Sequence, residues 1–329
     1  MPLLDVRDLS VVFKRRGEQP FTAVDGVSFN VEAGQTVGLV GESGCGKSVT
    51  SLAIMRLLPR RGNTVTGTVR FDGTDLLRLS DDEMRDRRGR DIGMIFQDPL
   101  SSLNPVIPIG VQVAEVLQRH QGQDKRESAR NARNLLDAVG IPDPDRRLKE
   151  YPHQISGGMR QRALIAMALA CKPRLLIADE PTTALDVTIQ AQILTLLKDL
   201  VHETGSALIM ITHDLGVVAG LCDTVNVLYA GKVVETSPRR PLFAEPRHPY
   251  TNGLMNSIPR LDLPRGAPLT PIRGSVNDNI PWREGCAFAP RCDNVLDVCL
   301  EGTPPLADDG YQGLRCNNPV SRPQEVATP

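Results

Sequence analysis

The chain has 329 residues, with 38 lysines and arginines against 39 aspartates and glutamates, and a formal net charge of −1. Its hydrophobic content of 40% and charged content of 23% favour a folded core and exclude global disorder. The balanced charge argues against a dedicated nucleic-acid binder, and no apolar run approaches the ~20 residues that span a bilayer. Asp5 and Asp8 interrupt the N-terminal apolar stretch, which predicts that no signal peptide is present.

Short apolar strands alternate with helical patterns from Leu3 to about Val234. Near-continuous apolar runs predict buried parallel strands over 36–40, 175–179, 206–212 and 224–231. Apolar residues at helical spacing predict helices over 112–120 and 127–140. Prolines become dense from Pro238 onward, and the alternation of strand and helix is lost there. We therefore expect a first domain over 1–237, a proline-rich connector over 238–275, a small C-terminal unit over 276–329, and a loose tail after Pro319.

A phosphate-binding loop is predicted in the segment GESGCGKS, which begins at Gly41. The segment fits the pattern Gly-x4-Gly-Lys-Ser and lies between a predicted strand and a predicted helix. Gly41, Gly44 and Gly46 let the backbone turn so that successive N–H groups form an anion nest. Lys47 would reach the outer phosphates of a nucleotide, and the Ser48 hydroxyl would ligate Mg²⁺. The alternative, a glycine-rich structural turn, does not explain the lysine and the hydroxyl together.

Two carboxylates follow the predicted strand LLIAD. Asp179 ends this strand and Glu180 comes directly after it. Carboxylates at the C-terminal end of a strand, beside an anion nest, are what a Mg-nucleotide site requires. Asp179 would hold Mg²⁺, and Glu180 would orient or deprotonate the attacking water. An ordinary pair of carboxylates before the helix that follows PTTALD is the alternative.

The remaining motifs lead to a resemblance. They are FQDP (96–99), ISGGMRQR (155–162), PTTALD (181–186) and ITHD (211–214), in that order along the chain. With the P-loop they resemble the Q-loop, signature, D-loop and switch histidine of ABC-type ATPases, over residues 3–234. GESGCGKSV, FQDPLSSLNP, YPHQISGG, ADEPTTALDVTIQAQIL and RHPYT resemble, more narrowly, the ATPase subunits of di- and oligopeptide or nickel importers.

The resemblance implies an α/β fold. That fold is an ABC-type P-loop ATPase with a RecA-like mixed-sheet core, an antiparallel β subdomain and a helical subdomain at about 93–165. A small irregular C-terminal appendage would follow it. The implied activity is ATP hydrolysis that drives solute uptake through separate permease subunits.

The resemblance also assigns roles within the ATP site. Lys47, Gln97, Glu180 and His213 would be catalytic, and Ser48, Gln97 and Asp179 would ligate Mg²⁺. Phe13 would stack on the adenine of ATP, with Phe21 as the competing candidate. The other implied ATP contacts are Gly41, Ser43, Gly44, Cys45, Gly46, Lys47, Ser48, Val49, Ser156, Gly157, Gly158 and Asp186; the Cys45 side chain itself is expected to be a small filler.

The implied mechanism needs two chains. Ser156, Gly157 and Gly158 precede a predicted helix, which makes a second anion site. In the family this signature closes on the nucleotide held by a second ATPase subunit, and a heterodimer is expected. The other expected partners are two transmembrane permeases and, indirectly, an extracytoplasmic substrate-binding protein, with the chain peripheral on the cytoplasmic face of the inner membrane.

Four cysteines gather near the C-terminus, at Cys286, Cys292, Cys299 and Cys316. Such spacing in a cytosolic chain indicates a metal before a disulfide, and it does not match the short knuckles of zinc sites. Some importer ATPases carry a [4Fe-4S] cluster on an appendage of this kind, so the resemblance implies one here. Zinc and unmetallated thiols remain the alternatives.

Two other functions compete with the importer motor. Soluble ABC ATPases that act on DNA or ribosomes usually carry two cassettes, a coiled coil or an inserted zinc domain. Here only two short helices are predicted between Gln97 and Ser156. A redox or metal sensor with a vestigial ATPase is disfavoured by the intact Lys47, Glu180 and His213. The sequence does not distinguish a dipeptide, an oligopeptide or nickel as the solute.

Overall fold

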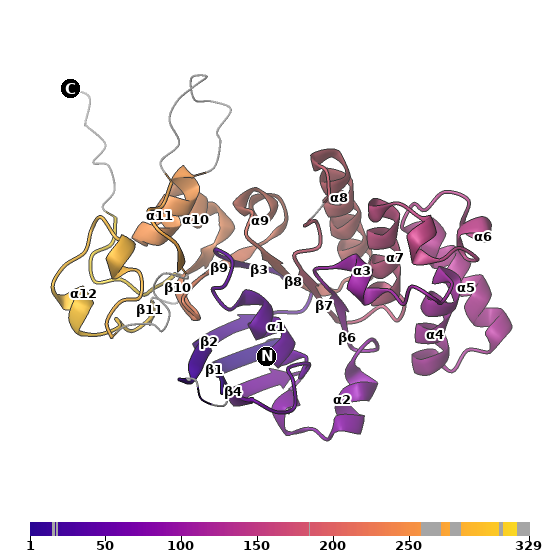
Figure 1. The fold of residues 1–329 in the computed structure, drawn as a ribbon, viewed down its shortest axis with the longest axis horizontal. Helices are drawn as coiled ribbons and strands as arrows, with labels where there is room; N and C mark the ends of the chain where they lie inside the picture. The colour runs from indigo at the N-terminus through magenta and orange to yellow at the C-terminus, as the bar shows by residue number, and fades with distance from the viewer. Residues whose placement is uncertain are drawn as a thin grey trace.

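The computed structural model describes residues 1–14, 17, 19–183, 185–257, 271–276, 284–308 and 312–320. Two sheets with helices around them make up these residues (Figure 1). The antiparallel sheet has the strand order β2-β1-β4-β5. Its strands are β1 (Leu4–Phe13), β2 (Phe21–Val31), β4 (Asn63–Phe71) and β5 (Thr74–Asp75).

The larger sheet is mixed and has the strand order β11-β12-β10-β9-β3-β8-β7-β6. β9, β3, β8, β7 and β6 run parallel to one another, whereas β10, β12 and β11 add to the edge of β9 in antiparallel pairs. The strands are β3 (Thr36–Val40), β6 (Ile92–Ile95), β7 (Leu175–Asp179), β8 (Ala207–Thr212), β9 (Thr224–Tyr229), β10 (Lys232–Pro238), β11 (Ala307–Asp308) and β12 (Gly313–Leu314). The mixed core sheet and the antiparallel sheet confirm the predicted fold class.

Helices connect these strands and cover the larger sheet. The α-helices are α1 (Lys47–Ile54), α2 (Asp81–Arg87), α3 (Pro99–Ser102), α4 (Ile109–Gln121), α5 (Lys125–Ala138), α6 (Pro144–Arg147), α7 (Gly157–Leu169), α8 (Val187–Thr204), α9 (Leu215–Leu221), α10 (Arg239–Ala244), α11 (Pro249–Asn256) and α12 (Val298–Glu301). Short 3₁₀ helices are η1 (Leu76–Arg78), η2 (Pro152–Gln154) and η4 (Ala289–Arg291).

The larger sheet separates two hydrophobic cores, because alternate side chains of a strand point to opposite faces. On β7, Leu175 and Ile177 pack with the antiparallel sheet and α1, whereas Leu176 and Ala178 pack with the helices of the other face. All of β7 is buried, as a parallel strand covered on both faces must be. Because these strands are buried on both faces, their ends are fixed in position. The loops that follow them carry the site described below.

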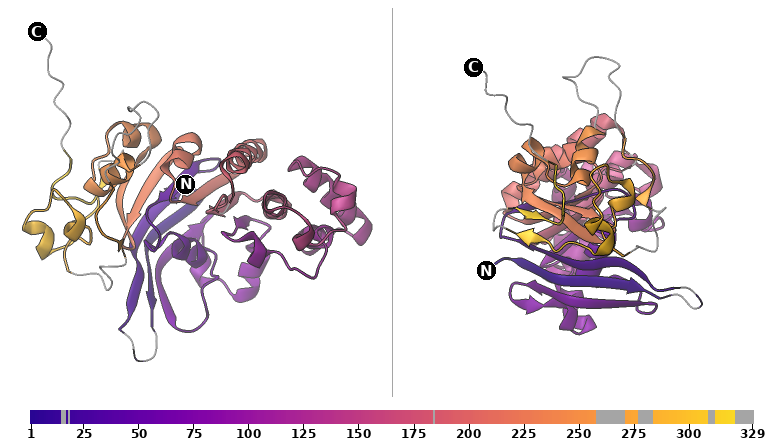
Figure 2. Two further views of the ribbon diagram at one scale, coloured as in Figure 1. Left: turned by 45° about the horizontal axis from the view of Figure 1, so that its top comes forward. Right: turned by 90° about the vertical axis from the view of Figure 1, so that its left-hand side faces the viewer.

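The helices α4, α5 and α6 lie at one end of the molecule, and α12 lies at the opposite end (Figures 1 and 2). Residues 93–95, which fall at the start of the predicted helical subdomain, belong instead to β6 and pair with β7. The strand has only four residues and includes Gly93 and Met94, so its short apolar run does not distinguish it from a helix start.

The C-terminal residues are joined to the core sheet. Glu235 and Thr236 of β10 pair with Leu314 and Gly313 of β12. The predicted connector contains two helices, α10 and α11. Pro249 is compatible with α11 because it occupies the first turn of that helix, where a missing N–H costs nothing. The rest of the connector over 258–270 and the predicted loose tail from 321 onward lie outside the described residues. Among the described helices, none is both long and apolar enough to cross a membrane.

Candidate functional site

The P-loop follows β3 and turns back sharply into α1. Gly46 has a φ of 98°, and a Cβ atom there would overlap the carbonyl oxygen of Ala23. Gly41 has a φ of 155°, and a Cβ atom there would overlap the carbonyl oxygen of Leu228. Both positions therefore require glycine, so the loop can place its N–H groups where the predicted anion nest needs them.

Lys47 begins α1 with a side chain that is only 4% exposed. Its Nζ donates to the carbonyl oxygens of Gly41 at 2.8 Å and Glu42 at 2.9 Å. The ammonium group therefore lies inside the loop, where phosphate oxygens of a nucleotide can replace these carbonyl partners. Cys45 points inward and is fully buried, and burial raises the pKa of its thiol, as expected of a small filler.

Ser48 and Asp179 contact each other where the P-loop enters α1. The Ser48 hydroxyl donates to Asp179 Oδ1 at 2.9 Å. Asp179 ends β7 and is 4% exposed, and burial raises the pKa of its carboxyl group. A hydroxyl and a carboxylate side by side are the oxygen ligands that Mg²⁺ prefers, so these two residues fit the predicted metal. The chemistry such an ion supplies is neutralisation of the charge on the outer phosphates.

Glu180 is the centre of a polar cluster. Its Oε2 accepts hydrogen bonds from Gln97 Nε2 at 3.0 Å and from Thr183 Oγ1 at 2.9 Å. Its Oε1 lies 3.4 Å from Nδ1 of His213, whose side chain is 59% exposed. The backbone of Glu180 has a φ of 45°, an unfavourable left-handed conformation for a glutamate. Strain of this kind persists where the surrounding structure holds a side chain in a required direction.

These groups come together because parallel strands end at one edge of the sheet. The P-loop follows β3, His213 follows β8, Glu180 follows β7, and Gln97 follows β6. A cavity of about 570 Å³ opens beside them and is lined by Gly41, Glu42, Ser43, Gln97, Glu180, His213, Leu254, Ser275 and Val276. The cleft at the C-terminal ends of the strands is where α/β sheets bind ligands.

The signature residues lie apart from this cavity. Ser156 caps α7, and its hydroxyl accepts a hydrogen bond from the N–H of Met159 at 3.3 Å. Ser156 and Gly157 are exposed, and Gly158 packs against Ile189 of α8. The described signature residues do not line the cavity beside their own P-loop, so a single chain does not bring the two anion sites together.

The other residues predicted to contact ATP lie on the P-loop, in α1, at the start of α8 and at the end of β1. Ser43 and Gly44 form the exposed rim of the P-loop. The Val49 side chain packs against the core, and the Asp186 carboxylate caps α8 through the N–H of Ile189 at 3.0 Å. Phe13 ends β1 opposite Phe21 and is partly buried against the same core, so its role in adenine stacking stays a prediction.

Two further residues contact the P-loop and were not predicted to do so. Arg291 donates to the carboxylate of Glu42, and the Tyr250 hydroxyl accepts the Glu42 N–H. Tyr250 belongs to RHPYT, one of the segments that carry the narrower resemblance, and no role was expected for it. Arg291 directly precedes Cys292, and nothing in the spacing of the two segments indicates that they reach the P-loop.

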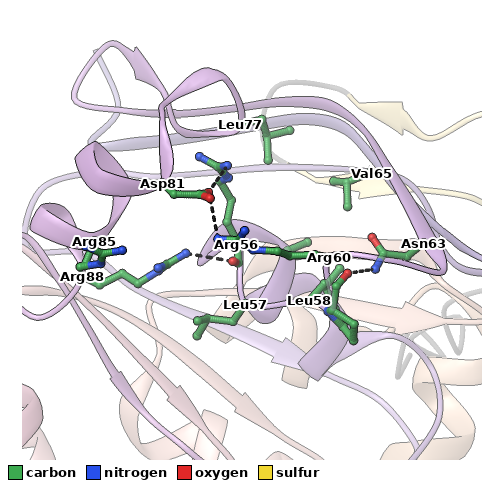
Figure 3. A pocket seen from close by; sticks show the side chains of 12 residues that line it. Arg56, Leu57, Leu58, Arg60, Asn63, Val65, Leu77, Asp81, Arg85 and Arg88 are labelled. Carbon is green, nitrogen blue, oxygen red and sulfur yellow. Dashed lines mark hydrogen bonds and ion pairs between the residues drawn. The ribbon is translucent and has the colours of Figure 1, made fainter.

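A separate cavity of about 410 Å³ lies where α1 ends (Figure 3). Its basic side chains are Arg56, Arg60, Arg85 and Arg88. Asp81 lies 3.2 Å from the Arg56 guanidinium and 2.6 Å from that of Arg60. None of the P-loop residues lines this cavity, so it is not part of the candidate nucleotide site.

The four C-terminal cysteines all line one small cavity under α11 and η4. Burial raises the pKa of the thiols of Cys286 and Cys292, and that of Cys316 to about 11. Within the described part of the chain, no group of three or more His, Cys, Asp or Glu side chains is placed to hold a metal ion. The structure thus brings the predicted cysteines together but does not support a metal there.

His248 borders the cysteine cavity and gives the fold a specific acid sensitivity. Its side chain caps α11 by accepting the Tyr250 N–H at 3.1 Å, and burial lowers its pKa from 6.5 to about 4. Below pH 6.5 His248 becomes protonated in the unfolded chain but stays neutral in the folded chain. The free energy of unfolding therefore falls as the pH falls toward 4. Between pH 7 and pH 5 we expect a loss of about 2 kcal/mol from this residue.

Urea unfolding of the native chain and of His248→Asn at both pH values measures this loss. Asparagine keeps an acceptor for the Tyr250 N–H but cannot titrate. The buried Glu235 accepts the N–H of His248, and burial raises its carboxyl pKa, but this group is present in both proteins and cancels. The same pH dependence in both proteins would contradict the assignment.

Two protein families match the chain. Residues 24–183 match the ABC transporter family, and residues 234–299 match the family described as the oligopeptide/dipeptide transporter C-terminal region. The chain is similar to the dipeptide transport ATP-binding protein DppD of Bacillus subtilis, with 55% identity over 90% of this chain and 88% of the relative. It is 49% identical to the oligopeptide transport ATP-binding protein OppD of Salmonella typhimurium, over 97% of this chain and 94% of the relative.

Solved structures agree with the fold. The ATP-binding cassette MJ0796, in a dimeric post-hydrolysis state bound to ADP and Pi, matches with a TM-score of 0.64 and 30% identity. The match covers 72% of this chain and 99% of that one. The structure of cbiO1 from Clostridium perfringens, part of the ABC transporter complex cbiONQ, matches with a TM-score of 0.61 and 27% identity over 74% of this chain and 91% of that one.

Proposed function

Because the chain belongs to the ABC transporter family, among its peptide-transport ATP-binding proteins, we propose that it is the ATP-hydrolysing subunit of a membrane peptide importer. One observation carries the proposal. At a single edge of the sheet lie the buried Lys47 of the P-loop, the hydrogen-bonded pair Ser48 and Asp179, and Glu180 with its hydrogen bond from Gln97. The same chain also matches the peptide-transporter C-terminal region.

The residues of this edge divide the chemistry among them. The P-loop N–H groups and Lys47 would bind the phosphates, and Ser48, Gln97 and Asp179 would hold Mg²⁺. Glu180 orients or deprotonates the water that attacks the γ-phosphate. Gln97 and His213, which already contact Glu180, complete the cluster around the γ-phosphate. Phosphoryl transfer of this kind depends mainly on positioning and on stabilising charge.

We propose that two ATP-binding chains close on each other with ATP between them. The exposed start of α7 at Ser156 and Gly157 supports this, because a helix N-terminus carries partial positive charge and this one lies apart from its own P-loop cavity. Each ATP would lie between one P-loop and the signature of the other chain. Peptide importers commonly pair two different ATP-binding chains, so a heterodimer is proposed.

Introducing an arginine at Ser156 should separate ATP binding from dimer closure. In the Glu180→Gln background, we expect ATP to bring the chain and its companion ATP-binding chain together in sedimentation velocity. Adding Ser156→Arg should abolish this association while the affinity for Mg-ATP changes less than about twofold, because the arginine is remote from its own P-loop. Thr195→Arg, on the exposed side of α8, is the control. Association that survives Ser156→Arg would contradict the arrangement.

The chain would act with two permeases as a peripheral protein on the cytoplasmic side of the membrane, and a separate binding protein would deliver the solute. Deleting its gene should abolish uptake of labelled di- or oligopeptides by cells. The native gene should restore uptake, whereas Glu180→Gln should not. Peptide uptake that persists without the chain would contradict the proposal, and loss of nickel uptake instead would reassign the solute. The comparisons give no support to a soluble ATPase that acts on DNA or ribosomes.

For the C-terminal cysteines we propose a [4Fe-4S] cluster held by Cys286, Cys292, Cys299 and Cys316. The donor set supports it, because four soft thiols, the ligands that iron–sulfur clusters take, line one cavity. Such a cluster would be a structural clamp for the C-terminal unit.

Anaerobic purification tests this proposal. We expect about four iron atoms per chain and absorbance near 400 nm, both typical of thiolate-ligated clusters. Cys292→Ser should lose iron and absorbance, whereas Cys171→Ser, remote from the cavity, should keep them. A native chain with neither iron nor absorbance would remove the cluster from the account.

A further inference from the structure

Arg291 reaches the P-loop from the C-terminal end of the chain. Its guanidinium donates two hydrogen bonds to the Glu42 carboxylate, at 2.6 and 3.0 Å, and its side chain is only 4% exposed. Such a fork of two parallel bonds to a carboxylate is among the strongest and most directional contacts that proteins make. Further bonds to the carbonyl oxygens of Arg273 at 2.7 Å and Gly274 at 3.1 Å fix the guanidinium itself.

Tyr250 holds the same P-loop residue by its backbone. The Glu42 N–H donates to the Tyr250 hydroxyl at 2.8 Å, and Tyr250 is fully buried. Its ring contacts the rings of Tyr229 and Phe288, with centroids 4.7 and 5.3 Å away. Both the side chain and the backbone of Glu42 are therefore held by residues that follow the ATPase core in the sequence.

The held residue is connected to the phosphate-binding lysine. The carbonyl oxygen of Glu42 accepts a hydrogen bond from Lys47 Nζ at 2.9 Å. Glu42 and its neighbours Gly41 and Ser43 also line the cavity beside Glu180. A contact that fixes Glu42 therefore fixes the first half of the loop and one partner of Lys47. A loop held in its binding conformation binds ligand more tightly, because less ordering cost remains to be met.

We propose that Arg291 is a positioning residue for ATP: through Glu42 it holds the P-loop in the conformation that binds the phosphates. This rests on the proposed function only in taking ATP as the ligand. The C-terminal unit thus acts on the nucleotide site of its own chain, although it contributes no atom to the predicted chemistry.

The competing explanation is that Arg291 only stabilises the C-terminal fold. The two differ in whether its effect on ATP binding passes through Glu42. A double-mutant cycle separates them, because two substitutions that remove one shared interaction do not add. A substitution that only weakens the fold lowers the melting temperature without a specific loss of ATP affinity.

The experiment is calorimetric titration of the full-length chain with Mg-ATP, with thermal unfolding measured alongside. We expect Arg291→Met and Glu42→Gln each to weaken ATP binding about tenfold, and the double variant to weaken it no further. Arg291→Lys should lose about threefold, because lysine keeps the charge but not the fork. Asp293→Asn is the matched control: it breaks an exposed ion pair with Arg273 from within the C-terminal unit and should stay within about twofold of native.

Native affinity in Arg291→Met would overturn the inference, as would a loss of about a hundredfold in the double variant. If Arg291→Met does not fold, Tyr250→Phe removes only the hydroxyl that holds Glu42 and should weaken ATP binding about threefold. Native affinity in that variant would overturn the claim that residues following the ATPase core position Glu42 for ATP binding. A native chain that binds no Mg-ATP would contradict the proposed function itself, which is a different outcome from native binding that ignores Arg291.

Discussion

Replacing Glu180 with glutamine should slow ATP hydrolysis by about 10²- to 10³-fold while Mg-ATP still binds, because glutamine keeps the shape of the side chain but cannot accept the proton of the attacking water. The side chain already accepts hydrogen bonds from Gln97 and Thr183, which aim it from two directions. The phosphate contacts are made elsewhere, by the P-loop, so affinity should change less than about threefold. The variant should therefore accumulate in the ATP-bound state.

Phosphate release by the chain assembled with its companion subunits measures the effect. Glu203→Gln removes an exposed carboxylate at the far end of α8 and should hydrolyse ATP at the native rate. Unimpaired hydrolysis by Glu180→Gln would refute the role of this residue, and loss of ATP binding would mean that it holds the loop rather than the water.

Replacing Lys47 with methionine should affect an earlier step. We expect the affinity for Mg-ATP to fall about 10- to 100-fold, because one buried, charge-assisted contact with the phosphates is lost. The ammonium group is 4% exposed and bonded to two carbonyl oxygens of the loop, so it is held where the phosphates would arrive. Hydrolysis at saturating ATP should fall as well, because the same charge stabilises the transition state.

Calorimetric titration checks the affinity, and Lys198→Met, which removes an exposed lysine of α8, is the control. Equal affinity in the native chain and in Lys47→Met would show that the loop does not bind ATP in the manner proposed.

The nucleotide edge could be predicted because its chemistry is local in the sequence. Each functional group follows a strand directly, as Glu180 follows β7 and His213 follows β8, and parallel strands bring their ends to one edge of a sheet. The apolar runs over 36–40 and 175–179 are the strands β3 and β7 with the predicted bounds. A strand buried on both faces leaves an unambiguous pattern.

The C-terminal contacts could not be predicted, because they depend on long-range placement. Arg291 and Glu42 are separated by 249 positions, and neither lies in a periodic segment that would fix its direction. β12 is only two residues long, and its pairing with β10 is set by tertiary packing rather than by its own composition. Prolines suggested irregular structure over 238–275, yet Pro249 starts a helix there.

The most direct test of the whole account is ATP turnover by the complete assembly. The chain, its companion ATP-binding chain and the two permeases are reconstituted in liposomes with Mg²⁺ and the peptide-loaded binding protein, and phosphate release and peptide accumulation are measured together. The account predicts hydrolysis that peptide stimulates, coupled to uptake, with both abolished when Glu180 is replaced by glutamine. An assembly that transports peptide without consuming ATP, or that consumes none at all, would contradict it.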